Sequence, residues 1–420
     1  MRREQTTRPS AAGGDRSYEP GRWMRVVRTV LLVKLAYAAV VAFMVFEGEA
    51  SFERETARAI LRGWFPRGWQ EEGRGRWERH FATWDAEHYL YLSAEGYNPD
   101  ARSIAFYPLW PLLVRLTGAL TGWNHVVVGL ALANLFSAGA WCLFHRVAAR
   151  RWGERVADVA LATLVAFPGS LFFQFIYSES LFFLLLMVLW WGLERHRFGA
   201  AWVAAYLAPL ARGVGVFGVV PLAWQAVFHM RGRWLPRWRW WREEQERVTA
   251  GGSGWGGKAW GLVLAPVLGW GTYLGLMKLW TGNAFAGVEA QKYWGVHAIW
   301  HLWDLRGFWE SLFDVRSWHE FHSSLLDRVG FLLLVYSLPV QWFMGRDLWA
   351  WTAMLGVVPA LSGRFVSYIR FESCTFPLFV ALGGVLCLFR RSWPAVVWVM
   401  LNLAVHLHLL WRFLNYRWAG

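Results

Sequence analysis

The sequence predicts an all-α polytopic membrane protein, and three observations carry that prediction. Apolar runs long enough to cross a bilayer recur from end to end of the 420 residues. Hydrophobic residues make up 56% of the chain and charged residues only 17%, whereas a soluble protein carries about a quarter charged residues. Arginine clusters lie between the apolar runs, as the positive-inside rule expects of short cytoplasmic loops.

The net charge of +14 raises the question of nucleic-acid binding. Because the basic residues lie between apolar runs, we assign them to cytoplasmic loops that face anionic lipid. The sequence carries no signature of a base-reading fold. Cys142, Cys374 and Cys387 all lie within apolar runs, which argues against a disulfide framework or a zinc site.

The first expected span is 26–46. Residues 1–24 before it are polar and rich in arginine, and we expect them to be a disordered cytoplasmic N-terminus. No small-residue cleavage site follows the span, so we interpret it as an uncleaved anchor.

The first extracytoplasmic loop is expected to run over 47–124. Within it, the apolar stretch 104–120 contains Pro108 and Pro111, which interrupt helical hydrogen bonding. If this stretch crossed the membrane, every later arginine cluster would lie outside. We therefore expect an interfacial or re-entrant helix here.

The later apolar runs complete a single transmembrane domain, 25–420, with about eleven crossings in all. They are expected at 125–146, 156–172, 178–193, 200–210, 214–228, 260–280, 329–343, 348–361, 374–389 and 394–413. The segment 230–258 is then a basic cytoplasmic loop, and 281–328 is a second large extracytoplasmic loop.

The stretch 83–92, TWDAEHYLYL, places an ionisable cluster in the first extracytoplasmic loop. A loop aspartate is usually only a solvated charge. Here Asp85 is flanked by interface-preferring aromatic residues and by Glu87 and His88, which can tune or orient it. A carboxylate in this position suits a general base that takes the proton of an attacking hydroxyl. His88 is a weaker candidate for phosphate or acceptor contact, and Glu87 is expected to face water.

Charged residues also lie at other expected extracytoplasmic turns. Glu179, in the stretch 167–180, is either part of a simple polar turn or part of the polar wall of a substrate cavity. Arginines in short outside loops either extend to lipid headgroups or bind the phosphate of a lipid-linked substrate, because guanidinium matches phosphate oxygens. The three that concern us are Arg212, Arg364 and Arg370.

An ordered set of motifs then points to a family: WDAEHYL, AFYPLWPLL, FIYSESLFFLL, ARGVG and VEAQKYWG, followed by RF and FPLF. This set resembles the PIG-V type mannosyltransferases of GPI-anchor synthesis and their bacterial relatives, which are class C glycosyltransferases (GT-C fold). The resemblance extends from about Trp84 to Leu378. One departure is ARGVG, which stands where the family usually has Arg-Pro-Thr-Gly and weakens the assignment of Arg212.

The resemblance implies an inverting transfer of mannose, or a related hexose, from a polyprenyl- or dolichyl-phosphate donor. It implies Asp85 as catalytic base, with Arg370 and Arg212 binding the donor phosphate and Arg364 and His88 as further candidates. It requires no metal and no cofactor, and the acceptor is a lipid, a glycan or a protein. The motifs supply the substrate-binding candidates Trp84, Tyr107, Tyr177, Glu179, Gln291, Lys292 and Trp294.

Two other functions stay open at this point. A lipid or sugar transporter or flippase would line its mid-membrane helices with ionisable residues, and the apolar runs contain few besides Lys34. A non-catalytic membrane subunit would have Asp85 and Arg370 far apart. For the enzyme, we expect a bacterial cell membrane location, a cytoplasmic N-terminus and an extracytoplasmic active site.

Overall fold

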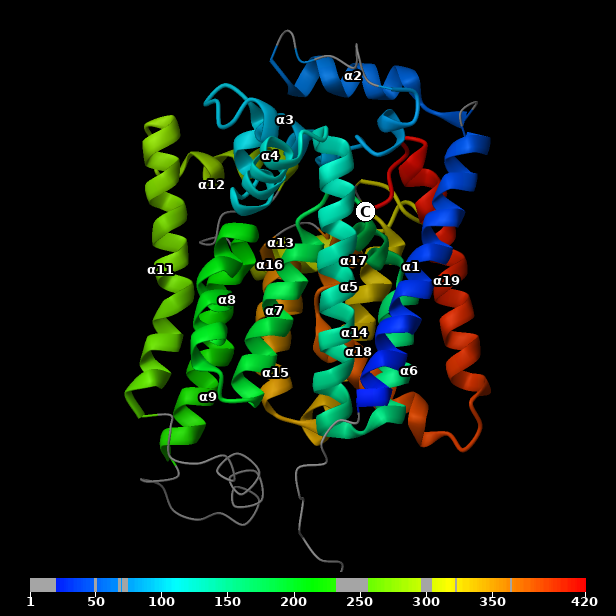
Figure 1. The fold of residues 1–420 in the computed structure, drawn as a ribbon, viewed down its shortest axis with the longest axis vertical. Coiled ribbons are helices and arrows are strands. Elements are labelled where there is room, and N and C mark those ends of the chain that lie inside the picture. The colour runs from blue at the N-terminus through cyan, green and yellow to red at the C-terminus, as the bar shows by residue number, and fades with distance from the viewer. Residues whose placement is uncertain are drawn as a thin grey trace, which may run out of the picture.

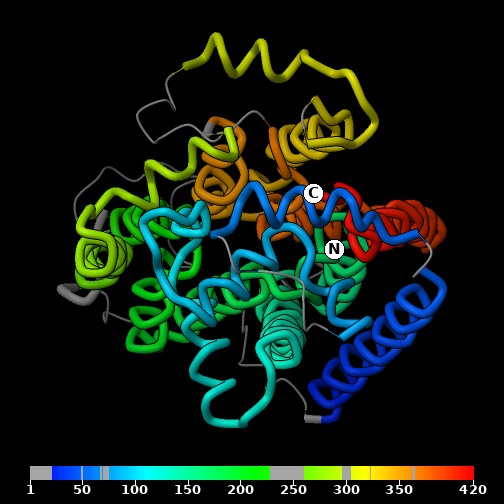
Figure 2. Tube along the Cα trace, turned by 90° about the horizontal axis from the view of Figure 1, so that it is seen from above, coloured from blue at the N-terminus to red at the C-terminus, as the bar shows by residue number. Residues whose placement is uncertain are grey.

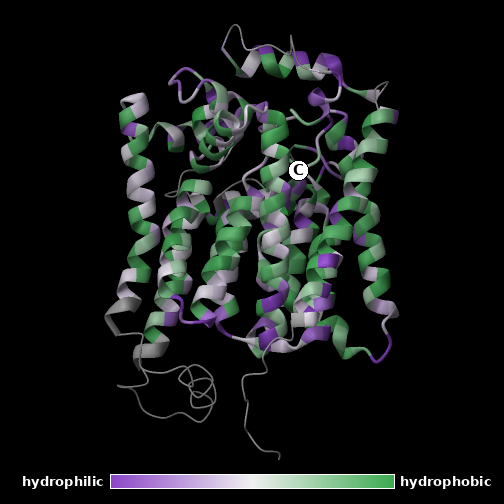
Figure 3. Ribbon diagram, in the orientation of Figure 1, coloured by the Kyte–Doolittle hydropathy of each residue, from purple (hydrophilic) through white to green (hydrophobic). Residues whose placement is uncertain are grey.

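The computed structural model describes residues 20–48, 51–66, 69, 75–231, 256–295, 304–321, 323–362 and 365–420. Among these residues the fold is built from helices, with one isolated bridge between Ser317 and Ser324 and no strand. The expected all-α class is confirmed. The long helices stand side by side in one bundle whose flanks are largely apolar (Figures 1 and 3).

Five helices in the described part of the chain are long and apolar enough to cross a membrane. They are α1 (Pro20–Gly48), α5 (His125–Trp152), α11 (Gly256–Thr281), α14 (Leu325–Met344) and α19 (Trp393–Leu414). A sixth span is possible if α6 (Glu154–Ala166) and η4 (Pro168–Gln174), bent by 81°, count as one. The chain is therefore an integral membrane protein.

Shorter helices fill the rest of the bundle. They are α7 (Glu179–Glu194), α8 (Phe198–Ala211), η5 (Gly213–Gly218), α9 (Val219–Arg231), α15 (Asp347–Thr352), η8 (Ala353–Val357), α16 (Val358–Ser362) and α18 (Phe376–Leu388). A further short apolar helix, α4 (Leu109–Thr121), lies at one end of the bundle (Figure 1). Several lie where shorter crossings were expected, but they fall below the length of a full span. The count of eleven crossings stays a prediction.

Short helices gather at one end of the bundle, and α2 lies across that end (Figures 1 and 2). They are α2 (Arg54–Trp64), η2 (Glu78–His80), α3 (Asp85–Ala94), η3 (Arg102–Ala105), α12 (Ala286–Ala290), η6 (Gln291–Trp294), α13 (Leu305–Phe313) and α17 (Tyr368–Glu372). Helix α2 is amphipathic: Ala57 and Leu61, one turn apart, are buried while its charged residues stay exposed.

Two expected boundaries differ from the structure. Helix α1 begins at Pro20, inside the segment expected to be disordered, because proline suits the first turn of a helix. The stretch 104–120 is split between η3 and α4, with Pro108 as the N-cap of α4. Most of the expected basic loop 230–258 lies outside the described residues.

The break between α6 and η4 shapes the interior of the bundle. Pro168 cannot donate the hydrogen bond that would continue α6, so the chain turns there and η4 runs across the bundle. Every residue of η4 is buried, as irregular backbone at membrane depth must be. The turn delivers Glu179 to the start of α7, under the short helices that cap the bundle.

Candidate active site

Asp85 is the first residue of α3, and an unusual backbone conformation at Trp84 places it there. Trp84 has φ 52°, a left-handed conformation that is uncommon for a large side chain. The conformation is held because the Trp84 indole donates to the backbone oxygen of Arg417 at 3.2 Å and packs against Tyr416 and Trp418. The carboxylate therefore lies in the first turn of a helix, where the helix dipole favours negative charge.

Glu179 occupies the same kind of position, because it is the first residue of α7. Its side chain is completely buried. One of its oxygens lies 2.7 Å from Nε of Arg370 and 2.5 Å from Nη1 of Arg212. The sequence left open whether Glu179 is a plain polar turn residue, and the contact with two guanidinium groups decides against it.

The two arginines lie at the opposite ends of their helices. Arg212 is the C-cap of α8, and Arg370 is in the last turn of α17. Cations are favoured at helix C-termini, where backbone carbonyls are left without partners. Asp85, Glu179 and Arg212 therefore lie where a helix end supports their charge, whereas α17 is only five residues long.

The four groups form an alternating row, Asp85–Arg370–Glu179–Arg212, which we call the charge row. Nη1 of Arg370 donates to Oδ2 of Asp85 at 2.5 Å, which completes the sequence of contacts. Two guanidinium groups and two carboxylates give the row a net charge of zero. Burial disfavours the charged form of Arg370, but the carboxylates of Glu179 and Asp85 outweigh it and raise the pKa of Arg370 above its ordinary value.

A cavity of about 130 Å³ opens onto this row. Seven of the expected site residues line it: Asp85, Arg212, Arg370, Trp84, Tyr107, Gln291 and Trp294. Further aromatic walls and hydroxyls come from Trp64, Tyr89, Phe106, Ser178, Phe321, Ser367, Phe371 and Trp418. The cavity thus combines cations, one carboxylate and aromatic faces, which suits a phosphate-linked sugar chemically.

Tyrosine hydroxyls in the cavity wall stay protonated and can donate hydrogen bonds. The hydroxyl of Tyr89 lies 2.9 Å from Oγ of Ser178. Burial is the largest cause that raises the pKa of Tyr89 and of Tyr107. Gln291 reaches the site from the second large loop, where its amide donates to the backbone oxygen of Ala105 at 2.6 Å.

Several expected site residues lie elsewhere. Tyr177 is buried behind the row, with the Arg370 guanidinium 5.3 Å from its ring centre. Lys292 is exposed and contacts the ring of Tyr293 instead of lining the cavity. Arg364 lies outside the described residues.

His88 and Glu87 are both buried, although neither lines the cavity. His88 stacks on Phe106, and its Nδ1 lies 2.7 Å from Oγ of Ser103. Burial lowers the pKa of His88 to about 3, so the ring is neutral and offers no cation to a phosphate. Glu87, expected to face water, is instead buried and accepts a hydrogen bond from the indole of Trp69 at 2.5 Å.

Two glycines that sequence reasoning passed over set the geometry of the site. A Cβ on Gly169 would come 2.0 Å from the backbone oxygen of Ile369, so η4 can lie this close to α17 only with glycine there. A Cβ on Gly213 would come 2.1 Å from the hydroxyl of Tyr107. Gly213 stands within the motif ARGVG and Gly169 within the stretch 167–180, and no other feature of the sequence pointed to them.

One group in the described part of the chain has the ligand spacing of a metal site. It comprises His145, Glu154 and Asp158, on α5 and α6. His145 already pairs with Asp158 at 2.8 Å, and none of the three lines the cavity.

Comparison with known proteins gives a partial match to one family. Residues 71–236 match the family model described as Mannosyltransferase (PIG-V). The GPI alpha-1,6-mannosyltransferase 2 proteins of Cricetulus griseus and Mus musculus are each 33% identical over 161 residues, which cover 36% of this chain and 32% of each relative. The chain thus matches about a third of the length of these curated relatives.

Solved structures of an archaeal enzyme also align with the chain. The Archaeoglobus fulgidus oligosaccharyltransferase in complex with Zn and sulfate has a TM-score of 0.45 and 12% identity, covering 91% of this chain and 53% of that one. The same organism's enzyme with an inhibitory peptide and a dolichol-phosphate has a TM-score of 0.43 and 12% identity, covering 91% and 56%.

The sequence match falls on the segment that builds most of the site. It contains Asp85, Glu179 and Arg212, three of the four members of the charge row, together with the bend between α6 and η4. Residues 71–236 are therefore the part of the chain that is similar to the Mannosyltransferase (PIG-V) family.

Proposed function

We propose that the chain is an inverting glycosyltransferase that moves a mannose, or a related hexose, from a polyprenyl-phosphate donor to a hydroxyl group of a lipid, glycan or protein acceptor. The observation that carries the proposal is the contact between Asp85 and Arg370 at the edge of the cavity. A candidate base and a candidate phosphate-binding cation meet there, although 285 positions separate them in the sequence. A non-catalytic subunit gives no reason for that arrangement.

The chemistry follows from the charge row. The acceptor hydroxyl attacks the anomeric carbon from the face opposite the phosphate, and Asp85 takes the hydroxyl proton. The new carbon–oxygen bond forms as the bond to the phosphate oxygen breaks, and the departing phosphate keeps the electron pair. Arg370 and Arg212 neutralise that developing charge.

The ion pair between Asp85 and Arg370 suggests an order of events. While Arg370 holds Asp85, the carboxylate is engaged and is a poor proton acceptor. A donor phosphate that binds Arg370 takes the place of Asp85 at Nη1 and leaves the carboxylate free to act. Glu179 keeps both guanidinium groups in position during this exchange, because it contacts both.

The face of the membrane is also part of the proposal. Basic residues at helix ends remote from the cavity, among them Arg150 and Arg151 at the C-terminus of α5 and Arg22 and Arg25 near the start of α1, support a cytoplasmic location for that end. The cavity then opens on the extracytoplasmic side of a cell membrane. We propose that this membrane is bacterial.

The test is transfer from radiolabelled polyprenyl-phosphate mannose by the purified protein in nanodiscs, with total membrane lipid as acceptor. Released polyprenyl phosphate is measured beside the labelled product. We expect Asp85→Asn to lower the rate ~10²–10⁴-fold. The matched control is Asp100→Asn, an exposed aspartate in the same loop, which we expect to retain full activity.

Two outcomes separate the alternatives. If Asp85→Asn transferred mannose as fast as the wild type, Asp85 would not be the catalytic base. Movement of labelled donor across the bilayer without any chemical product would favour a flippase. The structure gives the flippase little support, because the mid-membrane ammonium of Lys34 is already bound by Asn134, Ser137 and Gln174.

A further inference from the structure

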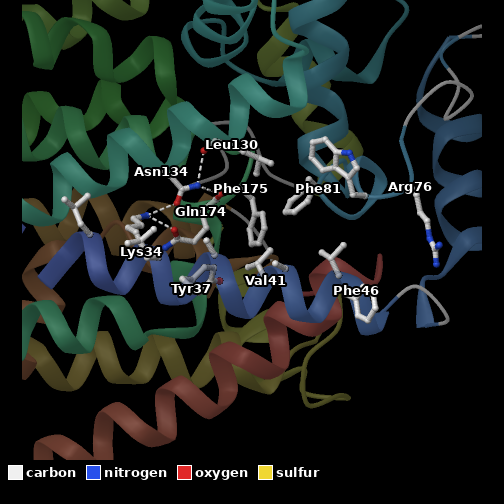
Figure 4. A pocket seen from close by; sticks show the side chains of 16 residues that line it. Lys34, Tyr37, Val41, Phe46, Arg76, Phe81, Leu130, Asn134, Gln174 and Phe175 are labelled. Atoms are coloured by element: carbon white, nitrogen blue, oxygen red, sulfur yellow. Dashed lines mark hydrogen bonds between the residues drawn. The ribbon is translucent and has the colours of Figure 1, made fainter. Parts of the chain in front are cut away.

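A long groove lies beside α1, and it shares no lining residue with the cavity at Asp85. Its volume is about 1220 Å³. Figure 4 shows it running along α1 from Lys34 at one end to Phe46 and Arg76 at the other. The groove is far larger than one side chain or one ordered water could occupy.

The walls of the groove are hydrocarbon. One wall is a stripe of α1 at helical spacing, and the other includes Leu130, Phe81 and Phe175. The stripe consists of Leu31, Leu35, Ala38, Val41, Ala42 and Val45. Leu35 is 67% and Phe46 is 82% exposed, so the groove opens sideways onto the surface that a bilayer covers.

At the inner end of the groove lies Lys34, whose side chain is fully engaged in hydrogen bonds. The Lys34 ammonium donates to Gln174 at 2.6 Å, Ser137 at 2.5 Å and Asn134 at 3.2 Å, and it lies 4.2 Å from the ring centre of Trp141. An ammonium has three protons, and all three have acceptors here. Lys34 therefore ties α1 to α5 and η4 and offers no free donor.

The outer end is basic and aromatic. Arg76 and Trp77 lie at this end and are both exposed, as suits residues at the level of lipid headgroups. From Phe46 to Lys34 is twelve residues of helix, or ~18 Å at 1.5 Å per residue. One leaflet of a bilayer is ~15 Å deep in hydrocarbon. A single acyl chain whose headgroup lies at Arg76 therefore fills most of the groove and ends short of Lys34.

We propose that this groove binds an anionic glycerophospholipid, with one acyl chain along α1 and its phosphate at Arg76. A guanidinium beside an apolar channel of leaflet depth complements the charge and shape of that molecule. The lipid joins α1, most of whose surface is otherwise exposed, to the rest of the bundle. The proposal does not depend on the proposed function.

The bound lipid is distinct from a donor held at Arg370. Aromatic rings separate the two sites: Phe81 and Phe175 lie 6.1 Å apart, and Phe175 and Phe413 lie 4.5 Å apart, centre to centre. Tyr177 continues this layer to the guanidinium of Arg370. A lipid with its phosphate at Arg370 cannot place its chain in this groove without moving that layer.

The test is native mass spectrometry of delipidated protein titrated with dioleoyl phosphatidylglycerol or dioleoyl phosphatidylcholine. We expect the wild type to retain one phosphatidylglycerol at least tenfold more tightly than phosphatidylcholine. Ala42→Trp fills the groove and should abolish this binding. Ala39→Trp is the matched control, because Ala39 is exposed on the same helix but does not line the groove.

A second pair of variants tests the headgroup contact. Arg76→Gln should remove the preference for phosphatidylglycerol, whereas Arg58→Gln, which removes an exposed charge from α2, should keep it. Equal binding of the two lipids by the wild type would overturn the proposal, whatever the variants do. Equal retention of phosphatidylglycerol by Ala42→Trp and Ala39→Trp would also overturn it.

Discussion

Replacing Glu179 with glutamine removes the one carboxylate that contacts both arginines of the charge row. Glutamine keeps the size of the side chain and one oxygen that can still accept from a guanidinium. The net charge of the row changes from zero to +1, because two arginines then face only Asp85. The variant therefore tests the electrostatics of the row with little change in its packing.

The magnitude follows from the burial of the group. The Glu179 side chain is 0% exposed, and its oxygen lies 2.5 Å from Arg212 and 2.7 Å from Arg370. Removing one partner from a buried ion pair costs about 3–5 kcal/mol. Because glutamine preserves shape and one acceptor, we expect the lower end, ~3 kcal/mol, which for a chain of 420 residues corresponds to a fall in Tm of roughly 3 °C.

The assay is thermal unfolding of the purified protein, with and without added polyprenyl phosphate. Since the variant row has an unbalanced positive charge, polyprenyl phosphate should raise the Tm of Glu179→Gln more than that of the wild type. Glu310→Gln is the control, because its pair with Arg306 is largely exposed and is worth at most about 1 kcal/mol. The electrostatic account of the row would be refuted if Glu179→Gln had the same Tm as the wild type and polyprenyl phosphate raised both Tm values equally.

Three further substitutions test the surroundings of the site. Gly169→Ala forces η4 away from α17 and should lower the transfer rate at least tenfold. Gly139→Ala is the control, because a Cβ at Gly139 has ordinary space. Equal transfer rates of the two variants would contradict the close approach of η4 to α17. Gly213→Ala displaces the Tyr107 hydroxyl in the cavity wall and should raise the KM for the donor. An unchanged KM would argue against Tyr107 as part of the donor site. His88→Gln tests burial by pH: the folded pKa of about 3 lies below the unfolded value near 6.5, so the unfolded state alone binds the proton between them and stability is lost as the pH falls through that window. From pH 7 to 5 the free energy of unfolding of the wild type should therefore fall by about 2 kcal/mol more than that of the variant. Equal falls in the two proteins, measured by thermal unfolding at each pH, would contradict this.

The bundle could be predicted from the sequence because each long apolar run is a local property. The exact ends were harder to place, since they depend on single residues. Pro20 starts α1 earlier than the hydrophobic pattern does, and Pro168 turns the chain out of α6 where the apolar run continues. Proline changes the backbone conformation, and a hydrophobic pattern gives no information about backbone conformation.

The site could be predicted only in part. Topology and motif resemblance selected Asp85, Arg212 and Arg370, and all three line one cavity. The order of the charge row was out of reach, because two of its contacts join Arg370 to Asp85 and Glu179, which lie far from it in the sequence. Glu179 shows the same limit: its burial follows from the path of η4 rather than from its own neighbours in the sequence.

The residues of 83–92 show how burial changes a role. Asp85, Glu87 and His88 are ionisable residues of one short stretch, yet they have three different environments. Glu87 accepts a hydrogen bond from Trp69, and His88 packs against the rings of Trp64, Phe65 and Phe106. Only Asp85 opens onto the cavity, because Trp84 turns the chain just before it.

The most direct measurement is a structure of the protein with bound polyprenyl phosphate. We predict that the lipid phosphate lies within hydrogen-bond distance, ~3 Å, of the guanidinium groups of Arg370 and Arg212, and that Asp85 has released Nη1 of Arg370. A lipid phosphate bound away from both arginines, with the contact between Asp85 and Arg370 intact, would contradict the proposed mechanism.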